Sequence, residues 1–229
     1  MTGTSEIAPT IMSAMSWEER AFERSPAVQR SRERVAAQAR LMLDAAHRLV
    51  LVKGDAFTTQ ELAAEAGVAL QTFYRYFASK DELLLAVLGD SMTTACRQWR
   101  EAASKLDDPL DRLRLYIVTA LELLDANNGD GGGTRFVVGA HWRLHRQYPK
   151  ELFDAEKPFV DLLREGVQDA IDGGRLNPVD SEWDPWFLSE LVRSVYHYYA
   201  FAPRTEGDMD VVKDRLWHFC LTALGGARA

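Results

Sequence analysis

Side chains that can hydrogen-bond to nucleic acid are concentrated in one short segment of the chain. Residues 71–76 read Gln-Thr-Phe-Tyr-Arg-Tyr, and Phe73 lies four positions before Phe77. In a helix this spacing places both phenylalanines on one face, which we expect to be buried, and leaves the other side chains on different faces. Amide, hydroxyl and guanidinium groups bond to base edges and phosphates. A merely solvated face more usually carries Glu, Lys and Gln than two tyrosines, so the segment favours a DNA-contacting surface.

A second pair of chemically capable residues is His141 and His145, whose spacing allows one helix face to present two metal ligands. Their surroundings, His-Trp-Arg-Leu-His, lack the glutamate of a zinc protease motif, and no carboxylate or thiol partner is evident nearby. We therefore expect a polar helix face or a hydrogen bond to a ligand. The sequence predicts no metal site, no cofactor and no catalytic residue. A helical enzyme using these histidines is an alternative, but it lacks a nucleophile paired with a base.

The elements that must position the first segment are short helices. In every long segment where apolar residues recur regularly, they recur with the period of a helix. No run alternates polar and apolar residues convincingly enough to be a strand, so the predicted fold class is all-α. An amphipathic helix ends near Lys53. The capping box Thr58–Glu61 then begins a second helix, which ends at Gly67. A third helix follows through Phe77, and the capping box Ser79–Glu82 begins a longer fourth helix.

Two short helices joined by a glycine turn, after a longer helix, have the pattern of a helix-turn-helix whose second helix enters the major groove. Lys80 lies in the first turn of the following helix, where the helix dipole disfavours a cation. A phosphate bound by Lys80 and the free N–H groups of that helix start would explain the lysine. Asp81 and Glu82 could instead simply offset its charge.

In the rest of the chain, segments rich in glycine, asparagine or proline separate the predicted helices. The periodicity predicts helices over residues 109–127, 134–148, 149–172, 184–201 and 208–224. The domains expected are an extension over residues 1–30, disordered or forming a short helix around Trp17, a DNA-binding domain over 31–90, and a larger helical domain for regulation and dimerisation over 91–229. Arg30, Arg32 and Arg34 alternate just before the first predicted helix. They form either a basic arm that contacts DNA or an ordinary charged helix start.

Composition indicates an ordinary globular protein. The 229 residues are 47% hydrophobic and 27% charged, and no apolar run reaches the roughly 18 to 20 residues of a membrane span. The first residues lack a secretory pattern, so we expect a cytoplasmic protein in which Cys96 and Cys220 are buried free thiols. The net charge of −7 argues against indiscriminate nucleic-acid binding. Residues 27–80 nevertheless hold eight basic and five acidic side chains, so a polyanion can bind there.

The segment Phe57–Leu84, which reads FTTQELAAEAGVALQTFYRYFASKDELL, resembles the DNA-binding region of the TetR family of repressors. The motif is long and specific, and the resemblance covers residues 35–95. It implies a homodimeric transcriptional repressor that binds operator DNA and is released by a small, mostly apolar inducer, with no membrane partner. The alternatives are the helical enzyme and an interaction module that has lost DNA binding.

The resemblance also implies which residues contact DNA. Thr58 and Thr59 match the helix start where a hydroxyl meets phosphate. Backbone-contacting positions of the family match Thr72, Tyr74 and Lys80. The helical phase of the segment adds Arg75 to the expected DNA contacts. Positions that approach bases match Gln60, Leu70, Gln71 and Tyr76. The family commonly has a small residue where Gln71 stands, and the helical phase of Leu70 allows either a core position or a contact to a thymine methyl.

For the larger domain the resemblance implies an apolar cavity, whose wall suits Tyr and Trp because each adds a polar group to an apolar ring. The lining residues predicted are Tyr116, Phe136, Trp142, Trp186 and Tyr196. The last two helices carry more apolar stripes than a monomer needs to bury. One stripe is Leu188, Leu191, Val195 and Tyr199, and another is Val212, Leu216, Phe219 and Ala223. The surplus predicts a symmetric four-helix dimer interface.

Overall fold

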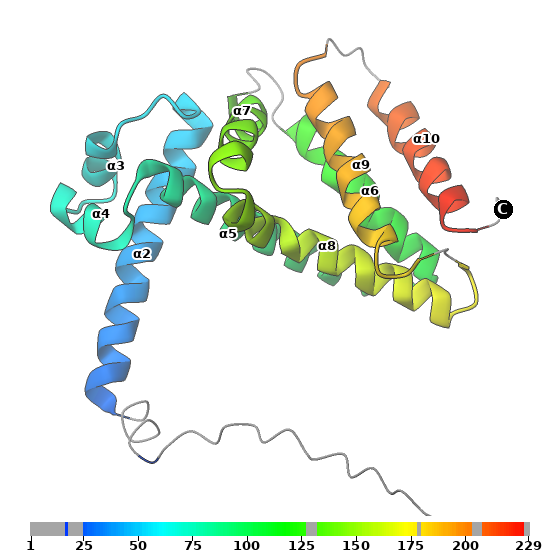
Figure 1. Cartoon of the computed structure of the whole chain (residues 1–229), viewed down its shortest axis with the longest axis horizontal. Helices are drawn as coiled ribbons and strands as arrows, with labels where there is room; N and C mark the ends of the chain where they lie inside the picture. The colour runs from blue at the N-terminus through cyan, green and yellow to red at the C-terminus, as the bar shows by residue number, and fades with distance from the viewer. Residues whose placement is uncertain (1–16, 18–24, 127–131, 178–179, 203–207, 227–229) are drawn as a thin grey trace, which may run out of the picture. The chain divides into compact units, whose positions relative to one another are not determined.

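The computed structural model describes residues 17, 25–126, 132–177, 180–202 and 208–226, and within them the regular secondary structure is α-helix joined by turns and loops. The predicted all-α fold class is confirmed (Figure 1). The helices are α2 (Pro26–Lys53), α3 (Thr59–Glu65), α4 (Leu70–Tyr76), α5 (Lys80–Ala103), α6 (Pro109–Ala126), α7 (Gly132–Gln147), α8 (Pro149–Asp172), α9 (Asp184–Tyr199) and α10 (Asp208–Ala223).

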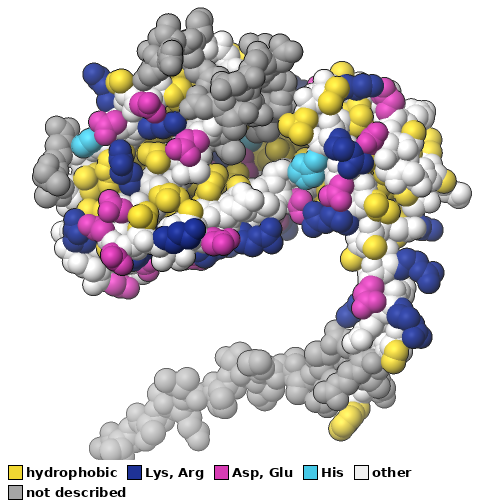
Figure 2. All heavy atoms as spheres, turned by 180° about the vertical axis from the view of Figure 1, so that it is seen from behind, with side chains coloured by type: hydrophobic (Ala, Val, Ile, Leu, Met, Phe, Trp, Pro, Cys, Tyr) yellow, Lys and Arg dark blue, Asp and Glu magenta, His cyan; other side chains and the backbone are white. Residues whose placement is uncertain are grey.

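The chain divides into two compact units, Met1–Leu41 and Met42–Ala229, and α2 passes from the first into the second. In the first unit, Arg side chains project from α2 (Figure 2). Arg30, Arg32 and Arg34 are exposed, but they lie inside the helix. The prediction that they precede it is wrong, because α2 already begins at Pro26, a residue whose fixed φ suits a first helical position. Most of the predicted extension 1–30 lies outside the described residues.

The second unit begins with the predicted helix-turn-helix. Thr58 caps α3: its hydroxyl accepts a bond from the Glu61 N–H, and the Glu61 carboxylate accepts one from the Thr58 N–H. The turn after α3 requires Gly67, whose φ of 66° disfavours any residue with a side chain. Phe73 and Phe77 are buried as predicted, with ring centroids 5.9 Å apart. This small core also receives side chains from α2, α5, α7 and α8.

The start of α5 departs in one detail from the predicted capping box. Ser79 accepts a bond from the Glu82 N–H, as a cap should, but the Glu82 carboxylate bonds to the N–H of Ala78. The reciprocal bond therefore falls one residue earlier than predicted.

A second, larger core holds the remaining helices together. Helices α5 and α8 pack along one another, and α6, α9 and α10 complete the bundle (Figure 1). Cys96 and Cys220 are buried free thiols in this core, as predicted, and burial raises the pKa of each to about 12. Among the helices described, none is both long and apolar enough to cross a membrane.

Candidate DNA interface and ligand cavity

Helix α4 has one buried face and one exposed face. Phe73 is fully buried, whereas Gln71, Tyr74 and Arg75 are exposed. The Tyr74 hydroxyl lies 3.4 Å from the Thr59 hydroxyl, so the outward faces of α3 and α4 touch. The arrangement offers a hydrogen-bonding surface that spans both short helices.

The other predicted contact residues surround this surface. Thr58 and Gln60 are exposed at the start of α3, and Thr72 is half-buried. Leu70 and Tyr76 are half-buried and pack against the helix-turn-helix core, which limits what they can offer to DNA. The predicted contact residues of α3 and α4 therefore lie on two adjoining helices. Among them, Leu70 and Tyr76 pack against the core.

Lys80 has a structural partner that the sequence did not indicate. Its ammonium donates to the carbonyl oxygens of Asp55 and Phe57, the latter at 2.6 Å, and lies 4.4 Å from the centroid of the Phe57 ring. Burial lowers the pKa of this ammonium. These bonds fasten the loop before α3 to the start of α5, so a lysine at this helix start is explained without a phosphate.

A second anchor ties the same loop to α7. The Arg143 guanidinium lies 3.1 Å from an Asp81 carboxylate oxygen and 3.7 Å from one of Asp55. On the other side of the motif, Lys53 bonds to Glu61 at 2.5 Å. That bond and the bonds from Thr58 hold the pKa of the Glu61 carboxyl at about 2.

A partly open cavity of about 200 Å³ lies between α5, α8 and α9, with contributions from α6 and α7. Helix α5 supplies one face of it, because Leu88, Met92, Ala95 and Trp99 recur at helical spacing. The wall is mostly apolar, and Phe159 meets Trp99 edge-on at 5.7 Å between ring centroids.

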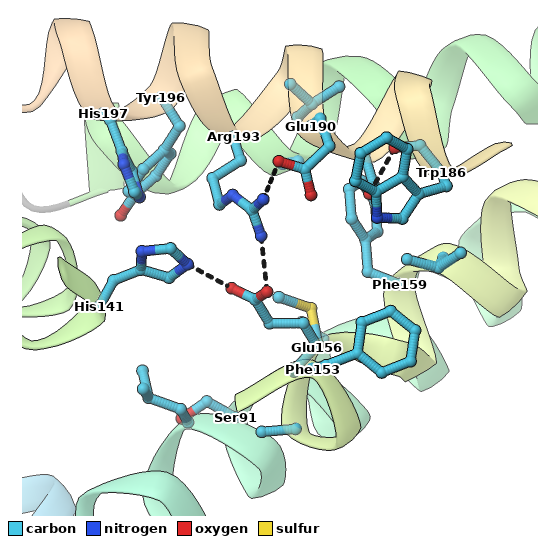
Figure 3. Close-up of a pocket in the computed structure, with 18 of the residues that line it drawn as sticks. Ser91, His141, Phe153, Glu156, Phe159, Trp186, Glu190, Arg193, Tyr196 and His197 are labelled. Carbon is cyan, nitrogen blue, oxygen red and sulfur yellow. Dashed lines mark hydrogen bonds and ion pairs between the residues drawn. The ribbon is translucent and has the colours of Figure 1, made fainter. Parts of the chain in front are cut away.

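Polar groups gather in one part of this wall (Figure 3). Arg193 donates to a Glu156 oxygen at 2.6 Å and pairs with Glu190, one turn away on α9. His141 Nε2 lies 2.9 Å from the other Glu156 oxygen. The His197 ring lies edge-on to that of His141, at 4.8 Å between centroids. Burial, together with His141 and Arg193, lowers the pKa of His197 to about 4, so its imidazole is neutral at pH 7.

The predicted lining residues divide into three groups. Trp186 and Tyr196 line the cavity. Tyr116 is buried in the bundle core and Trp142 is exposed, and neither lines the cavity. The side chain of Phe136, in α7, lies outside the described residues.

Sequence reasoning missed Glu156 on α8 and Arg193 and His197 on α9, because no local motif marks them. A weak signal existed in Glu190 and Arg193, which are three positions apart as ion pairs on one helix face often are. His141 and His145 stack at 5.9 Å, but only His141 lines the cavity. In the part of the chain that is described, no group of three or more His, Cys, Asp or Glu residues is arranged to bind a metal.

The last two helices do carry surplus apolar side chains, and of the predicted stripes Phe219 is among them. Leu188 belongs to the bundle core, and Leu191, Val195 and Tyr199 are half-buried and pack against it. The exposed apolar residues of this region are Trp183, Phe187, Tyr198, Phe201, Val211 and Phe219. Leu216, predicted to be part of a surplus stripe, is 6% exposed and belongs to the core, whereas Phe219 is 64% exposed.

Residues 42–87 match the family model of bacterial regulatory proteins of the tetR family. No curated protein sequence matches the chain significantly. The resemblance inferred from the sequence is thus confirmed over the helix-turn-helix, from the second half of α2 to the first turns of α5.

Several solved structures share the fold, among them that of the transcriptional regulator FadR. FadR from Bacillus subtilis, in complex with stearoyl-CoA, is 16% identical with a TM-score of 0.65, and the match covers 80% of this chain and 97% of FadR. RolR in complex with resorcinol is 19% identical with a TM-score of 0.62, over 85% and 90% of the two chains. AibR in complex with isovaleryl coenzyme A and operator DNA is 21% identical with a TM-score of 0.54, over 83% and 100%.

Proposed function

We propose, from the match of residues 42–87 to the family model of bacterial regulatory proteins of the tetR family, that the chain is a homodimeric transcriptional repressor. It binds operator DNA, acts in the cytoplasm, and is released from its operator by a small, mostly apolar ligand. It has no catalytic role. The observation that carries the proposal is α4, which buries Phe73 and presents Gln71, Tyr74 and Arg75 outward on a helix-turn-helix.

In this proposal α4 enters the major groove and the start of α3 lies against phosphate. Gln71 can form two bonds to the edge of an adenine, which is base readout, whereas Thr59, Tyr74 and Arg75 position the protein on the backbone. The net charge of −7 leaves the rest of the chain poorly suited to DNA. Binding therefore depends on this surface.

Gln71→Ala should change the preference at one base pair of each half-site by about 1 to 3 kcal/mol, because it removes base-edge bonds. Fluorescence anisotropy with operator duplexes that vary at single positions measures this. Gln98→Ala, the same change at an exposed position of α5, is the matched control and should leave every preference intact. Unchanged base preference in Gln71→Ala removes this glutamine from the reading surface.

Lys80→Ala should weaken all DNA sequences about equally and lower the salt slope of binding by roughly 1 per half-site, if its ammonium also reaches a phosphate. The bonds of Lys80 to Asp55 and Phe57 would be lost as well, so the variant should also unfold at lower urea concentration. Titrations at several salt concentrations separate the two effects. An unchanged slope with lowered stability restricts Lys80 to holding the loop before α3.

Two helices connect the cavity with the DNA-binding motif. Helix α5 begins at Lys80 beside the motif and lines the cavity from Leu88 to Trp99. Helix α7 carries His141 in the cavity wall and, two residues later, Arg143 beside Asp55 and Asp81. A ligand that shifts α7 against α5 would therefore move the loop that leads into α3. We propose this pair of helices as the route of induction.

The experiment that tests the proposal is binding of the purified chain to DNA from upstream of its own coding sequence. A specific regulator should bind that DNA at least about 1,000-fold tighter than an unrelated duplex of equal length and composition at physiological salt. A helical enzyme or an interaction module without DNA binding should show no preference between the two duplexes.

A further inference from the structure

The first half of α2 is a helix that contributes nothing to a core. Residues 29–37 are all exposed, and the first buried residue of α2 is Met42. Most helices in proteins are stabilised by packing of an apolar face, which these residues do not provide. Arginine side chains project from this part of the helix instead (Figure 2). We call residues 26–41 the arginine arm.

The charge of the arginine arm is opposite to that of the rest of the chain. Residues 26–41 contain four arginines and one glutamate, a net charge of +3, so the other residues together carry −10. A polyanion is therefore repelled by most of the chain and attracted by the arm. The arm precedes residues 42–87, over which the chain matches the tetR family model, so that match assigns it no role.

Two arginines of the arm are placed where they disfavour the helix that carries them. Arg30 and Arg34 lie one turn apart on the same face, where like charges destabilise a helix. The helix dipole favours acidic side chains in a first turn, and α5, α8 and α9 each have one there. The first turn of α2 has none, as is also true of α4, the helix proposed to enter DNA. Helix stability therefore does not explain these arginines.

Arg30 and Arg34 also have no partner among the residues that the structure describes. By contrast, Arg48, Arg100 and Arg175 each lie 2.8 Å or less from a carboxylate oxygen. A guanidinium has five N–H donors in a planar fork that matches the geometry of a phosphate. Two such groups on one exposed helix face can bind phosphate oxygens without first breaking an ion pair.

The arm is joined through one continuous helix to the DNA-binding motif. Met42, Ala45 and Ala46, in the second half of α2, pack in the core of the helix-turn-helix. Once α3 and α4 are bound to an operator, this connection holds the arm at a high effective concentration near phosphate. Phosphate contacts fix the position of a protein on DNA but carry no sequence information.

We propose that the arginine arm binds the phosphate backbone of DNA through Arg30 and Arg34. Its contacts add to those of α3 and α4 and raise the affinity for every DNA sequence, whereas the base preference is determined by α4. The assignment rests on the proposed function and extends the DNA interface beyond the helix-turn-helix.

The salt dependence of DNA binding by the full chain tests the assignment. Each phosphate contact contributes about 0.9 to the slope of log affinity against log salt concentration. The double variant Arg30→Ala, Arg34→Ala should therefore lower this slope by roughly 2 per half-site, weaken all duplexes about equally and leave the base preference unchanged. Alanine is the best helix former, so unfolding of the arm would not explain the loss. Anisotropy titrations at several salt concentrations measure the slope.

Two further double variants provide the controls. Arg97→Ala, Arg146→Ala removes the same charge from exposed positions outside the arm and should leave the slope intact. Arg30→Lys, Arg34→Lys keeps the charge of the arm and should retain most of the slope. An unchanged slope in the Arg30→Ala, Arg34→Ala protein overturns the proposal. An equal fall in the Arg97→Ala, Arg146→Ala protein, or a changed base preference in the first variant, overturns it as well.

The same titrations separate this assignment from the proposed function. Because phosphate contacts are independent of sequence, a similar fall in slope is expected with an unrelated duplex, so the test of the arm does not require a known operator. A wild-type protein without preference for its own upstream DNA contradicts the proposed function. A wild-type protein with that preference, and with the same salt slope as the Arg30→Ala, Arg34→Ala protein, contradicts only the role of the arm.

Discussion

Phe219→Glu is expected to convert the protein to a monomer and to weaken operator binding by at least about 100-fold. Phe219 is 64% exposed on α10, and Val211 lies on the same exposed side of that helix. Trp183, directly before α9, and Phe187 and Tyr198 on α9 are also exposed. Exposed apolar surface of this extent marks an interface. We propose that these faces form the symmetric dimer, in which a buried charge would be unpaired.

The loss of DNA affinity follows from linkage between half-sites. Once one motif of a dimer is bound, the second motif is held at a high effective concentration near its own half-site. The dimer therefore binds the operator about 10² to 10⁴-fold more tightly than a single motif does. Light scattering at micromolar concentration and anisotropy with the operator measure both effects. Gln98→Glu adds the same charge on the exposed face of α5 and should leave the dimer intact. A wild-type monomer, or a dimeric Phe219→Glu protein, contradicts this interface.

Phe73→Ala is expected to destabilise the protein by about 3 to 5 kcal/mol, the usual cost of removing a fully buried aromatic ring. Phe73 has no exposed surface, stacks on Phe77 and contacts Tyr74 edge-on at 5.0 Å. The surrounding core includes side chains from α7 and α8. The damage should therefore extend beyond the two short helices.

Tyr74→Ala is the matched control, because it removes the neighbouring ring from a position that is 53% exposed. It should cost less than about 1 kcal/mol of stability, since surface substitutions rarely cost more, yet it should weaken DNA binding. Urea unfolding followed by circular dichroism gives both stabilities. Equal destabilisation by the two variants would mean that α4 does not separate a buried face from a binding face.

Local signals in the sequence predicted the helix-turn-helix to within a residue. The Thr58–Glu61 capping box, Gly67 and the Phe73–Phe77 spacing each act within one turn of helix, so neighbouring residues alone determine the structure. The predicted helix over residues 149–172 likewise coincides with α8, because Pro149 and Gly173 lie at its ends.

Contacts between distant helices could not be predicted in the same way. Glu156 and Arg193 are 37 positions apart, and nothing local indicates that they pair. Lys80 appeared to need a phosphate because the carbonyl oxygens that it binds lie 23 and 25 positions earlier. On α10, Leu216 and Phe219 share an apolar period, but packing against other helices buries one and exposes the other. A helix that is apolar on two sides does not reveal which side faces its own core.

The central claim is that one chain reads DNA and releases it when the cavity is filled, and reciprocal binding measures this most directly. Operator affinity is determined by anisotropy with and without a saturating small molecule that calorimetry shows to bind the cavity, and the affinity of that ligand by calorimetry with and without operator. A ligand shifts DNA binding only by its differential affinity for the two states, and thermodynamic linkage requires the same factor in both directions. We expect roughly a 100-fold weakening of each by the other, about 2.7 kcal/mol of coupling. A cavity ligand that binds the protein equally well with and without operator would contradict the account.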